Sequence, residues 1–283
     1  MNDAPGKLPV WKTALESFRL TVRNFTTLLR FAWPWLLIFM AASAALYWNL
    51  YEAEQSALAA GNWGSPKLFY ATTVLSTVIG AFIAIPWHRL LLVGEQPASP
   101  SLAIDRRHVM YALLTLALFA LAPLPVLLAD LVTAPTVETE GLSIRDAAIA
   151  AGVLGFVACW LVINRLSLVL PVIALDPSRA SVREAWHITR GNTWRLFASS
   201  GLILLVIVPI FATLAVISEF FSGWNETQEK IEVTPVPSQV WFTAHSVLFE
   251  IAGITLGMLF VTFLSLAYRH FYGLTAPSEA AAH

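Results

Sequence analysis

Residues 195–218 read RLFASSGLILLVIVPIFATLAVIS and contain no charged side chain after Arg195. A helix needs about 20 mostly apolar residues to cross the hydrocarbon core of a bilayer, so this stretch predicts a membrane-spanning helix. The whole chain has a matching composition, with 57% hydrophobic and 12% charged residues and a mean hydropathy of +0.68. Soluble domains carry about 25% charged residues. Composition therefore indicates an integral membrane protein.

Five further segments meet the same criterion, which predicts six spans over residues 31–50, 69–93, 108–132, 144–170, 195–218 and 240–268. The basic residues are divided unevenly between the connections. We count each connection from the inner end of its preceding helix to the start of the next. Of 17 basic residues in the chain, five then lie before the first span, three in the second connection, five in the fourth and one after the last span. Because Lys and Arg in short loops are retained on the cytoplasmic side, we expect both termini to be cytoplasmic.

The predicted fold is all-α, a single integral membrane domain over residues 1–283 with three helical hairpins and two amphipathic interfacial helices on the cytoplasmic side. The even-numbered spans end in similar sequences, such as Arg89-Leu90-Leu91 and Arg165-Leu166-Ser167. Such matches favour a threefold repeat, as in some transporters, or arise by chance. The sequence leaves both alternatives open.

The first interfacial helix is predicted over residues 182–190, within the stretch ASVREAWHITRGNTWRLF (180–197). Ser181 and Glu184 have the spacing of a capping box, and Gly191 is well placed to end the helix. An apolar stripe includes Trp186, and the opposite side carries basic residues, which is typical of a helix at the membrane interface. The basic residues are Arg183, His187 and Arg190.

The second interfacial helix is predicted over residues 9–23. One stripe is apolar (Trp11, Leu15, Phe18, Val22 and Phe25), and another is charged (Lys12, Glu16, Arg19 and Arg23). Each basic group near an anionic leaflet contributes about 1 kcal/mol of binding free energy. Both helices are thus either collars that fix the following spans or binding sites for anionic phospholipid headgroups or a membrane-protein partner. A catalytic role is a third alternative.

Glu250 is the one carboxylate well inside a predicted span, and ionisable groups there are functional candidates. It shares a helix face with Gly253 and Gly257, which permit close packing within the molecule or in a homo-oligomer. The Glu250 carboxyl is either bonded to a neighbour or kept protonated, or it handles protons or cations together with His245. In the last case we expect Glu250→Gln to lower transport without preventing folding.

Arg89 and Arg165 lie slightly inside the inner boundary of their spans. They either snorkel to the headgroups or point inward and bind a phosphate or carboxylate. No hydrolase, metalloprotease or nucleotide-binding motif occurs in the sequence, and the lone Cys159 excludes a thiolate zinc cluster. We therefore expect no cofactor and no metal, and the net charge of −1 gives no reason to expect a nucleic-acid partner.

Three motifs together resemble a group of bacterial six-span inner-membrane proteins. They are Arg165-Leu-Ser-Leu-Val-Leu-Pro171-Val-Ile-Ala-Leu-Asp176, Ser181-Val-Arg-Glu-Ala-Trp186 and Arg190-Gly-Asn192-Thr-Trp-Arg-Leu-Phe197. The group includes the YciC-like proteins and the membrane domain of some glycerophosphoryl diester phosphodiesterases. The resemblance implies a six-span fold in a bacterial inner membrane and supplies no catalytic residue. The 283 residues hold no soluble phosphodiesterase barrel, so that activity is not carried over.

These observations predict a non-enzymatic accessory or scaffold protein in envelope or lipid homeostasis. The alternative is a small-solute or lipid transporter with Glu250 in its pathway. A membrane enzyme would need polar groups clustered at one leaflet, which a linear sequence cannot reveal.

Overall fold

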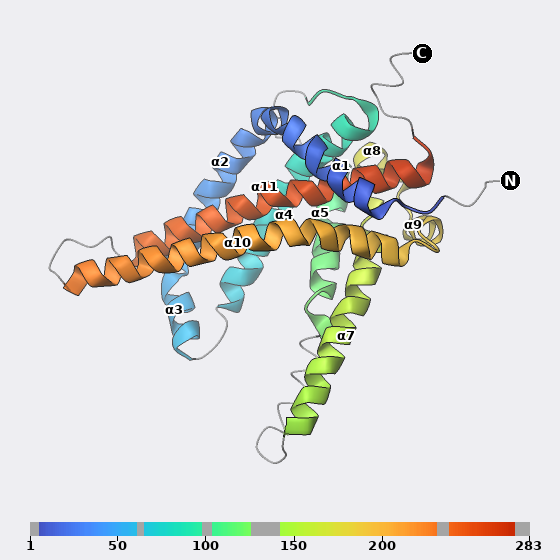
Figure 1. Cartoon of the computed structure of the whole chain (residues 1–283). Coiled ribbons are helices and arrows are strands. Elements are labelled where there is room, and N and C mark those ends of the chain that lie inside the picture. The colour runs from blue at the N-terminus through green and yellow to red at the C-terminus, as the bar shows by residue number, and fades with distance from the viewer. Residues whose placement is uncertain (1–5, 61–64, 98–103, 126–141, 231–237, 275–283) are drawn as a thin grey trace.

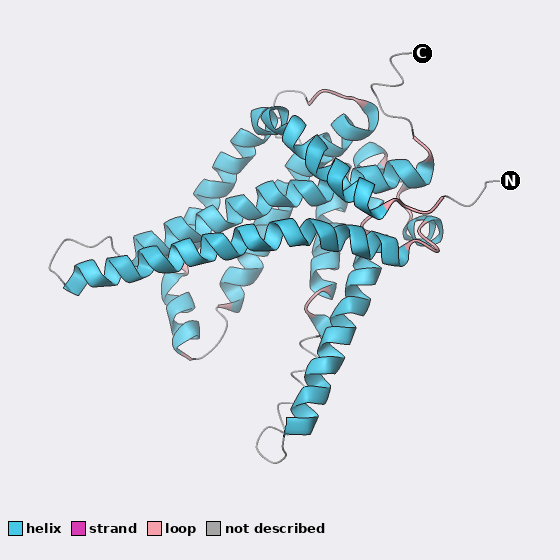
Figure 2. Ribbon diagram, viewed as in Figure 1, coloured by secondary structure: helices cyan, strands magenta, loops and turns pink. Residues whose placement is uncertain are grey.

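The computed structural model describes residues 6–60, 65–97, 104–125, 142–230 and 238–274, and within these ranges the chain forms helices and turns and no strand (Figures 1 and 2). The helices are α1 (Val10–Arg23), α2 (Phe25–Asn49), α3 (Tyr51–Ala59), α4 (Pro66–Val93), α5 (Arg106–Leu121), α7 (Leu142–Leu166), α8 (Val169–Leu175), the short 3-10 helix η1 (Pro177–Arg179), α9 (Val182–Ile188), α10 (Thr193–Lys230) and α11 (Ser238–Tyr272). The all-α prediction is confirmed.

Five helical segments in the described residues are long and apolar enough to cross a membrane. They are Phe25–Asn49, Pro66–Val93, Ala150–Leu175, Thr193–Ile217 and Gln239–Tyr272. Large apolar side chains along them are exposed, among them Leu154 at 71% and Leu205 at 70%. Such side chains are stable in contact with lipid and unfavourable in contact with water. The chain is therefore a multi-pass membrane protein.

The helix predicted over residues 108–132 is interrupted, and residues 124–125 are helical again. α5 stops at Leu121 and a turn follows at residues 122–123. Pro123 has no amide hydrogen, and its ring collides with the carbonyl of the preceding helical turn, so an α-helix cannot pass through it unchanged. Residues 126–132 lie outside the described residues, and the count of six spans stays a prediction.

The span predicted over residues 144–170 is interrupted. α7 ends at Leu166 and α8 begins at Val169. Pro171 cannot donate to the Ser167 carbonyl four residues before it, and that carbonyl instead accepts from the Leu170 amide at 3.0 Å. The interruption turns the chain and places α8 in the core, where its residues from Val169 to Ala174 are buried.

α11 lies at the centre of the molecule and packs against α1, α2, α4 and α10. α2 packs on α4, where Trp35 stacks on Phe82 with ring centroids 4.0 Å apart. α5 also packs on α4, whereas α7 leans on α10, where the Trp160 indole donates to Ser200 Oγ at 3.1 Å. The two helices of the predicted middle hairpin thus have different principal neighbours.

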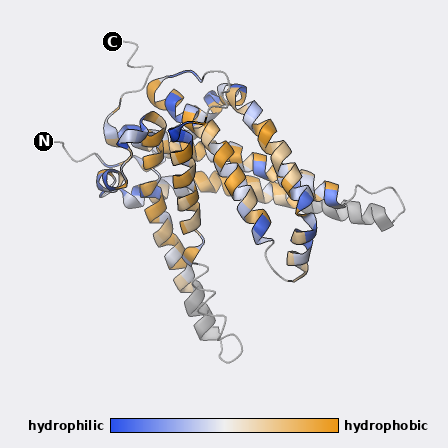
Figure 3. Cartoon of the chain, turned by 180° about the vertical axis from the view of Figure 1, so that it is seen from behind, coloured by the Kyte–Doolittle hydropathy of each residue, from blue (hydrophilic) through white to orange (hydrophobic). Residues whose placement is uncertain are grey.

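The spans gather at one end of the molecule and diverge toward the other, where α7 points away from α10 and α11 (Figure 1). We call the first end the basic end, because it holds Arg89, Arg165, Arg195 and His270. In Figure 3 the long helices are mostly apolar, and hydrophilic residues collect at the basic end and around α3. Among the described residues, hydrophilic side chains thus lie mainly at the ends of the long helices.

Candidate functional site

Arg165, near the end of α7, holds α9 against the bundle. Its guanidinium carbon lies 3.6 Å from the centre of the Trp186 ring, and its Nε donates to Thr189 Oγ1 at 2.9 Å. Nη2 donates to the Trp186 carbonyl. Arginine suits this place because its planar guanidinium stacks on an indole while donating hydrogen bonds. Arg165 therefore joins two helices of its own chain.

The ends of α9 are fixed by its neighbours in the sequence and by α11. Ser181 Oγ accepts the Glu184 amide at 3.2 Å, which is half of the predicted capping box. The Glu184 carboxylate accepts from the Tyr272 hydroxyl of α11 at 2.8 Å. Gly191 has a φ of 81°, a conformation that favours glycine at a helix end. α9 itself ends at Ile188, two residues before the predicted boundary.

Residues 6–9, which we call the N-terminal strap, are held by the opening of α10 and the end of α11. The Leu8 amide donates to Asn192 Oδ1 at 2.9 Å, and Arg195 Nη1 donates to the Leu8 carbonyl at 2.9 Å. His270 Nε2 lies 2.9 Å from the Gly6 carbonyl, to which it bonds. The Leu8 side chain is fully buried. Arg195, like Arg165, is thus a structural contact.

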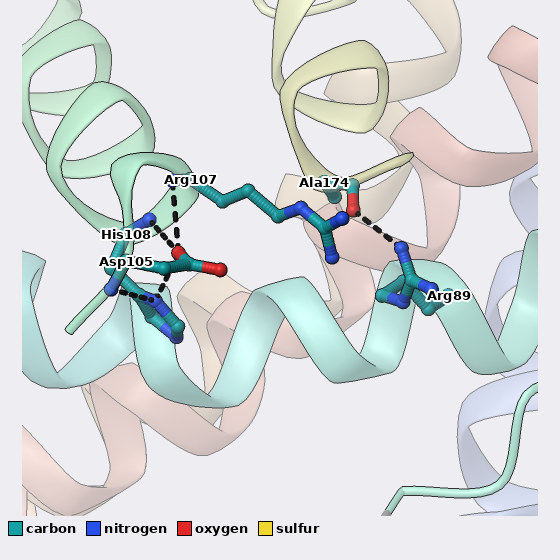
Figure 4. A network of polar contacts seen from close by, with 5 residues as sticks. All are labelled: Arg89, Asp105, Arg107, His108 and Ala174. Atoms are coloured by element: carbon teal, nitrogen blue, oxygen red, sulfur yellow. Dashed lines mark hydrogen bonds and ion pairs between the residues drawn. The ribbon is translucent and has the colours of Figure 1, made fainter. Parts of the chain in front are cut away.

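Arg89, near the end of α4, covers the C-terminal end of α8 (Figure 4). Its Nη1 donates to the carbonyls of Ala174 at 3.2 Å and Leu175 at 3.4 Å, and its Nη2 pairs with Glu95. The last carbonyls of a helix lack partners within the helix, and its dipole favours a cation there. The hydrogen bond from Arg89 lowers the pKa of the Glu95 carboxyl.

Asp105 caps α5 in the same region (Figure 4). Its Oδ1 accepts the amides of Arg107 at 2.9 Å and His108 at 3.2 Å, and it bonds the His108 ring at 2.7 Å. Burial opposes ionisation of Asp105, but these hydrogen bonds outweigh it and hold the pKa of the carboxyl below its usual value. In this corner Arg89 is thus paired with Glu95, and Asp105 with His108.

Three basic side chains on α9 and just after it differ from these, because they are exposed. They are Arg183, His187 and Arg190. Within the described part of the chain, their side chains form no hydrogen bond or ion pair. Trp186, on the same short helix, is 42% exposed. Arg190 also lies close enough to Arg165 for their charges to repel, which favours an anion between or beside them.

α1 carries a second exposed basic surface. Lys12, Arg19 and Arg23 are exposed, and so is the apolar stripe beside them, with Trp11 at 69% and Phe18 at 44%. A third face packs inward. It consists of Thr13, Ala14, Ser17 and Thr21. α1 is therefore a helix with three faces, of which the sequence predicted two.

The inward face of α1 enters a buried hydrogen-bond network. Thr21 Oγ1 lies 2.8 Å from Thr262 Oγ1 of α11, and the Trp87 indole of α4 donates to the same Thr262 oxygen at 2.8 Å. Thr262 is fully buried. The repeated Thr and Ser at positions 13, 17 and 21 were the signal for this face, since side chains four apart share one side of a helix.

His88 lies beside Trp87 in α4 and is fully buried. Its Nδ1 is 2.7 Å from Ser265 Oγ of α11, and its Nε2 is 3.1 Å from the Tyr111 hydroxyl of α5. Both ring nitrogens thus have partners, and the histidine connects three helices. Among the described residues no three His, Cys, Asp or Glu side chains are grouped to hold a metal ion.

Glu250, half-buried in α11, accepts a hydrogen bond from the Tyr47 hydroxyl of α2 at 3.2 Å. His245, five residues earlier, contacts the aromatic rings of Trp241 and Phe249. A Cβ at Gly253 would meet Phe211 of α10 at 3.8 Å, and one at Gly257 would meet nothing within 4 Å. Of the two glycines, Gly253 is the one that faces α10.

No protein-family model matches the chain, and no curated protein or solved structure matches it either. The resemblance of residues 165–197 to YciC-like proteins therefore stays a prediction. Function has to be argued from the geometry alone.

Proposed function

We propose that the chain is a multi-pass protein of a bacterial cytoplasmic membrane, with both termini cytoplasmic, that binds anionic phospholipid through α9 and α1. It acts as a non-enzymatic accessory or scaffold protein in envelope or lipid homeostasis. Under this proposal the basic end lies at the inner leaflet. The exposed cations of α9 and α1 reach the headgroups, and Trp186 and Trp11 lie at the boundary of the acyl chains, where indole rings are favoured.

The contrasting environments of the arginines support this proposal most directly. Arg89, Arg165 and Arg195 are bonded to backbone carbonyls of the same chain, whereas Arg183 on α9 and Arg190 just after it are exposed. Arg89, Arg165 and Arg195 therefore have hydrogen-bond partners within the protein. Arg183 and Arg190, with His187 beside them, have no such partner among the described residues, so their donors are available to groups outside the chain.

The test compares lipid binding by wild type and by Arg183→Ala/Arg190→Ala. Purified protein in detergent is titrated with dioleoyl phosphatidylglycerol and with dioleoyl phosphatidylcholine, and bound lipids are counted by native mass spectrometry. Each basic group near anionic lipid contributes about 1 kcal/mol, so we expect phosphatidylglycerol affinity to fall by about tenfold or more and phosphatidylcholine affinity to stay constant.

A matched control removes the same charge elsewhere. Lys67→Ala/Arg106→Ala changes two exposed residues at the starts of α4 and α5, and we expect it to lose less affinity for phosphatidylglycerol than Arg183→Ala/Arg190→Ala does. If both double variants lost the same affinity for phosphatidylglycerol, the effect would depend on net charge alone. That result would overturn the assignment of lipid binding to α9.

A further inference from the structure

An apolar cavity of about 370 Å³ lies between α1 and α10. Trp11, Leu15 and Phe18 line it from α1, and Leu202, Leu205 and Val206 line it from α10. Buried Leu259 of α11 lines it as well. The volume falls within the range of small-molecule sites, about 300–1,000 Å³. All of its lining residues are apolar.

The three-faced character of α1 explains why this cavity exists. The face that packs inward is narrow and made of small residues, Thr13, Ala14, Ser17 and Thr21. The large side chains of the apolar stripe therefore stand beside α10 and leave space between the helices. Trp11 at 69% and Leu205 at 70% exposure leave the cavity open on the outside, where lipid would surround it.

Helical spacing places two basic residues of α1 beside the apolar stripe that lines the cavity. Lys12 and Arg19 lie three residues before and four residues after Leu15, so they occupy the neighbouring ridge of α1, and both are exposed. A ligand with a long apolar part and an anionic head would match the cavity and its edge together.

We propose that this groove holds one acyl chain of an anionic phospholipid, whose phosphate contacts Lys12 and Arg19. This inference rests on the proposed function and adds to it a specific binding site for one lipid molecule. A peptide segment does not fit, because its backbone amides and carbonyls would lie unpaired against apolar walls. An acyl chain carries no polar group into the groove, and its headgroup stays at the basic edge.

The experiment uses phosphatidylglycerol with a photoactivatable diazirine in the middle of one acyl chain. The full-length protein is reconstituted with this probe in nanodiscs and irradiated, and labelled peptides are located by mass spectrometry. We expect label on residues 11–18 and 202–206 above the level on other spans. Excess unlabelled phosphatidylglycerol should reduce it, and the same amount of phosphatidylcholine should not.

Two substitutions on α10 form a matched pair. Val206→Trp fills the groove, while Val216→Trp makes the same change at a 69% exposed position outside it. Several methylene contacts are lost in the first variant, so we expect labelling of residues 11–18 to fall about tenfold there and to stay constant in the second. Lys12→Ala/Arg19→Ala should remove the preference for phosphatidylglycerol.

The outcomes separate this site from the α9 proposal. Lipid binding in the groove would be overturned if the label were spread evenly over the spans and unaffected by Val206→Trp. It would also be overturned if both lipids displaced the label equally. Lipid binding by α9 would then be decided by the α9 titration alone. Selective labelling of the groove together with an unchanged affinity in Arg183→Ala/Arg190→Ala would retain the groove and overturn lipid binding by α9.

Discussion

Arg165 and Arg183 are the same residue type in the same basic stretch of sequence, yet they have opposite environments. Arg165 stacks on Trp186 and donates to Thr189 and to a carbonyl, while Arg183 is exposed. Whether an arginine meets a partner depends on how α7 turns into α9, which residue type and spacing do not encode. The sequence therefore indicated a candidate site in this stretch. It did not show which of the arginines bond within the chain and which are exposed.

We expect Arg165→Lys to lower the free energy of unfolding by about 2 kcal/mol, because lysine cannot stack on the indole and donate in two directions at once. The measurement is thermal unfolding in detergent micelles. Arg183→Lys makes the same change on exposed α9 and should alter stability by less than about 0.5 kcal/mol. If the two variants melt alike, Arg165 does not hold α9.

Thr262 is the shared partner of Thr21 and Trp87. Thr262→Val keeps the shape, leaves the buried Trp87 indole N–H without its acceptor and removes the bond between α11 and the Thr21 hydroxyl. We therefore expect a loss of about 2 kcal/mol in the free energy of unfolding. Thr255→Val is the control, since Thr255 bonds only the Ile251 carbonyl of its own helix. A comparable loss in both would mean that threonine itself, rather than the network, sets the stability.

At the scale of elements, α1 illustrates what a sequence pattern can predict. Its limits at residues 10 and 23 lie within one residue of the predicted ones, because the pattern repeats over nearly four turns. The apolar stripe suggested a face toward lipid, and it is indeed exposed. The inward face escaped prediction because Thr and Ser alone do not reveal that their partners come from α11, far along the chain.

The sequence contains the prolines that can break a helix, but it does not show at which of them a helix is interrupted. Pro123 and Pro171 were visible in the sequence, yet membrane helices often tolerate proline when neighbours satisfy the freed carbonyls. The helices α2 and α4 continue through Pro34 and Pro86, whereas the chain turns near Pro123 and Pro171. The difference depends on tertiary packing, which is why the sequence could not place the turns at residues 122–123 and 167–168.

The cap of α5 gives a prediction about pH. The pKa of Asp105 is depressed in the folded protein, so its stabilising effect is complete above the ordinary value of 3.8 and is lost as the pH falls through the lower folded value. Asp105→Asn keeps a capping oxygen and removes the charge. We expect wild type to be more stable than this variant by about 0.5 kcal/mol at pH 6, allowing for the exposed position.

That stability difference should shrink toward zero when thermal unfolding is repeated at pH 3. A difference that stays constant across this range would show that the charge of Asp105 is not responsible.

At the scale of the whole molecule, Glu250 tests the transporter alternative. Its bond to Tyr47 joins α2 to α11, and glutamine can accept the same hydrogen bond. We therefore expect Glu250→Gln to unfold at the wild-type temperature. Proton flux into liposomes, followed with an enclosed pH-sensitive dye, should be equally slow for both proteins. Rapid flux in wild type that the variant lacks would favour the transporter over the accessory protein.

The N-terminal strap has a consequence for biosynthesis. Leu8 bonds Asn192, which lies 184 residues later in the chain, and Gly6 bonds His270, which lies 264 residues later. Ribosomes add about 5–20 residues per second, so the strap waits on the order of ten to fifty seconds for its partners to be translated. Until α10 and α11 have entered the bilayer, α1 has nothing to cover Thr13, Ser17 and Thr21. A ribosome that stalls before α11 thus leaves an incomplete chain whose α1 face is open to membrane quality-control proteases, while the finished chain closes it.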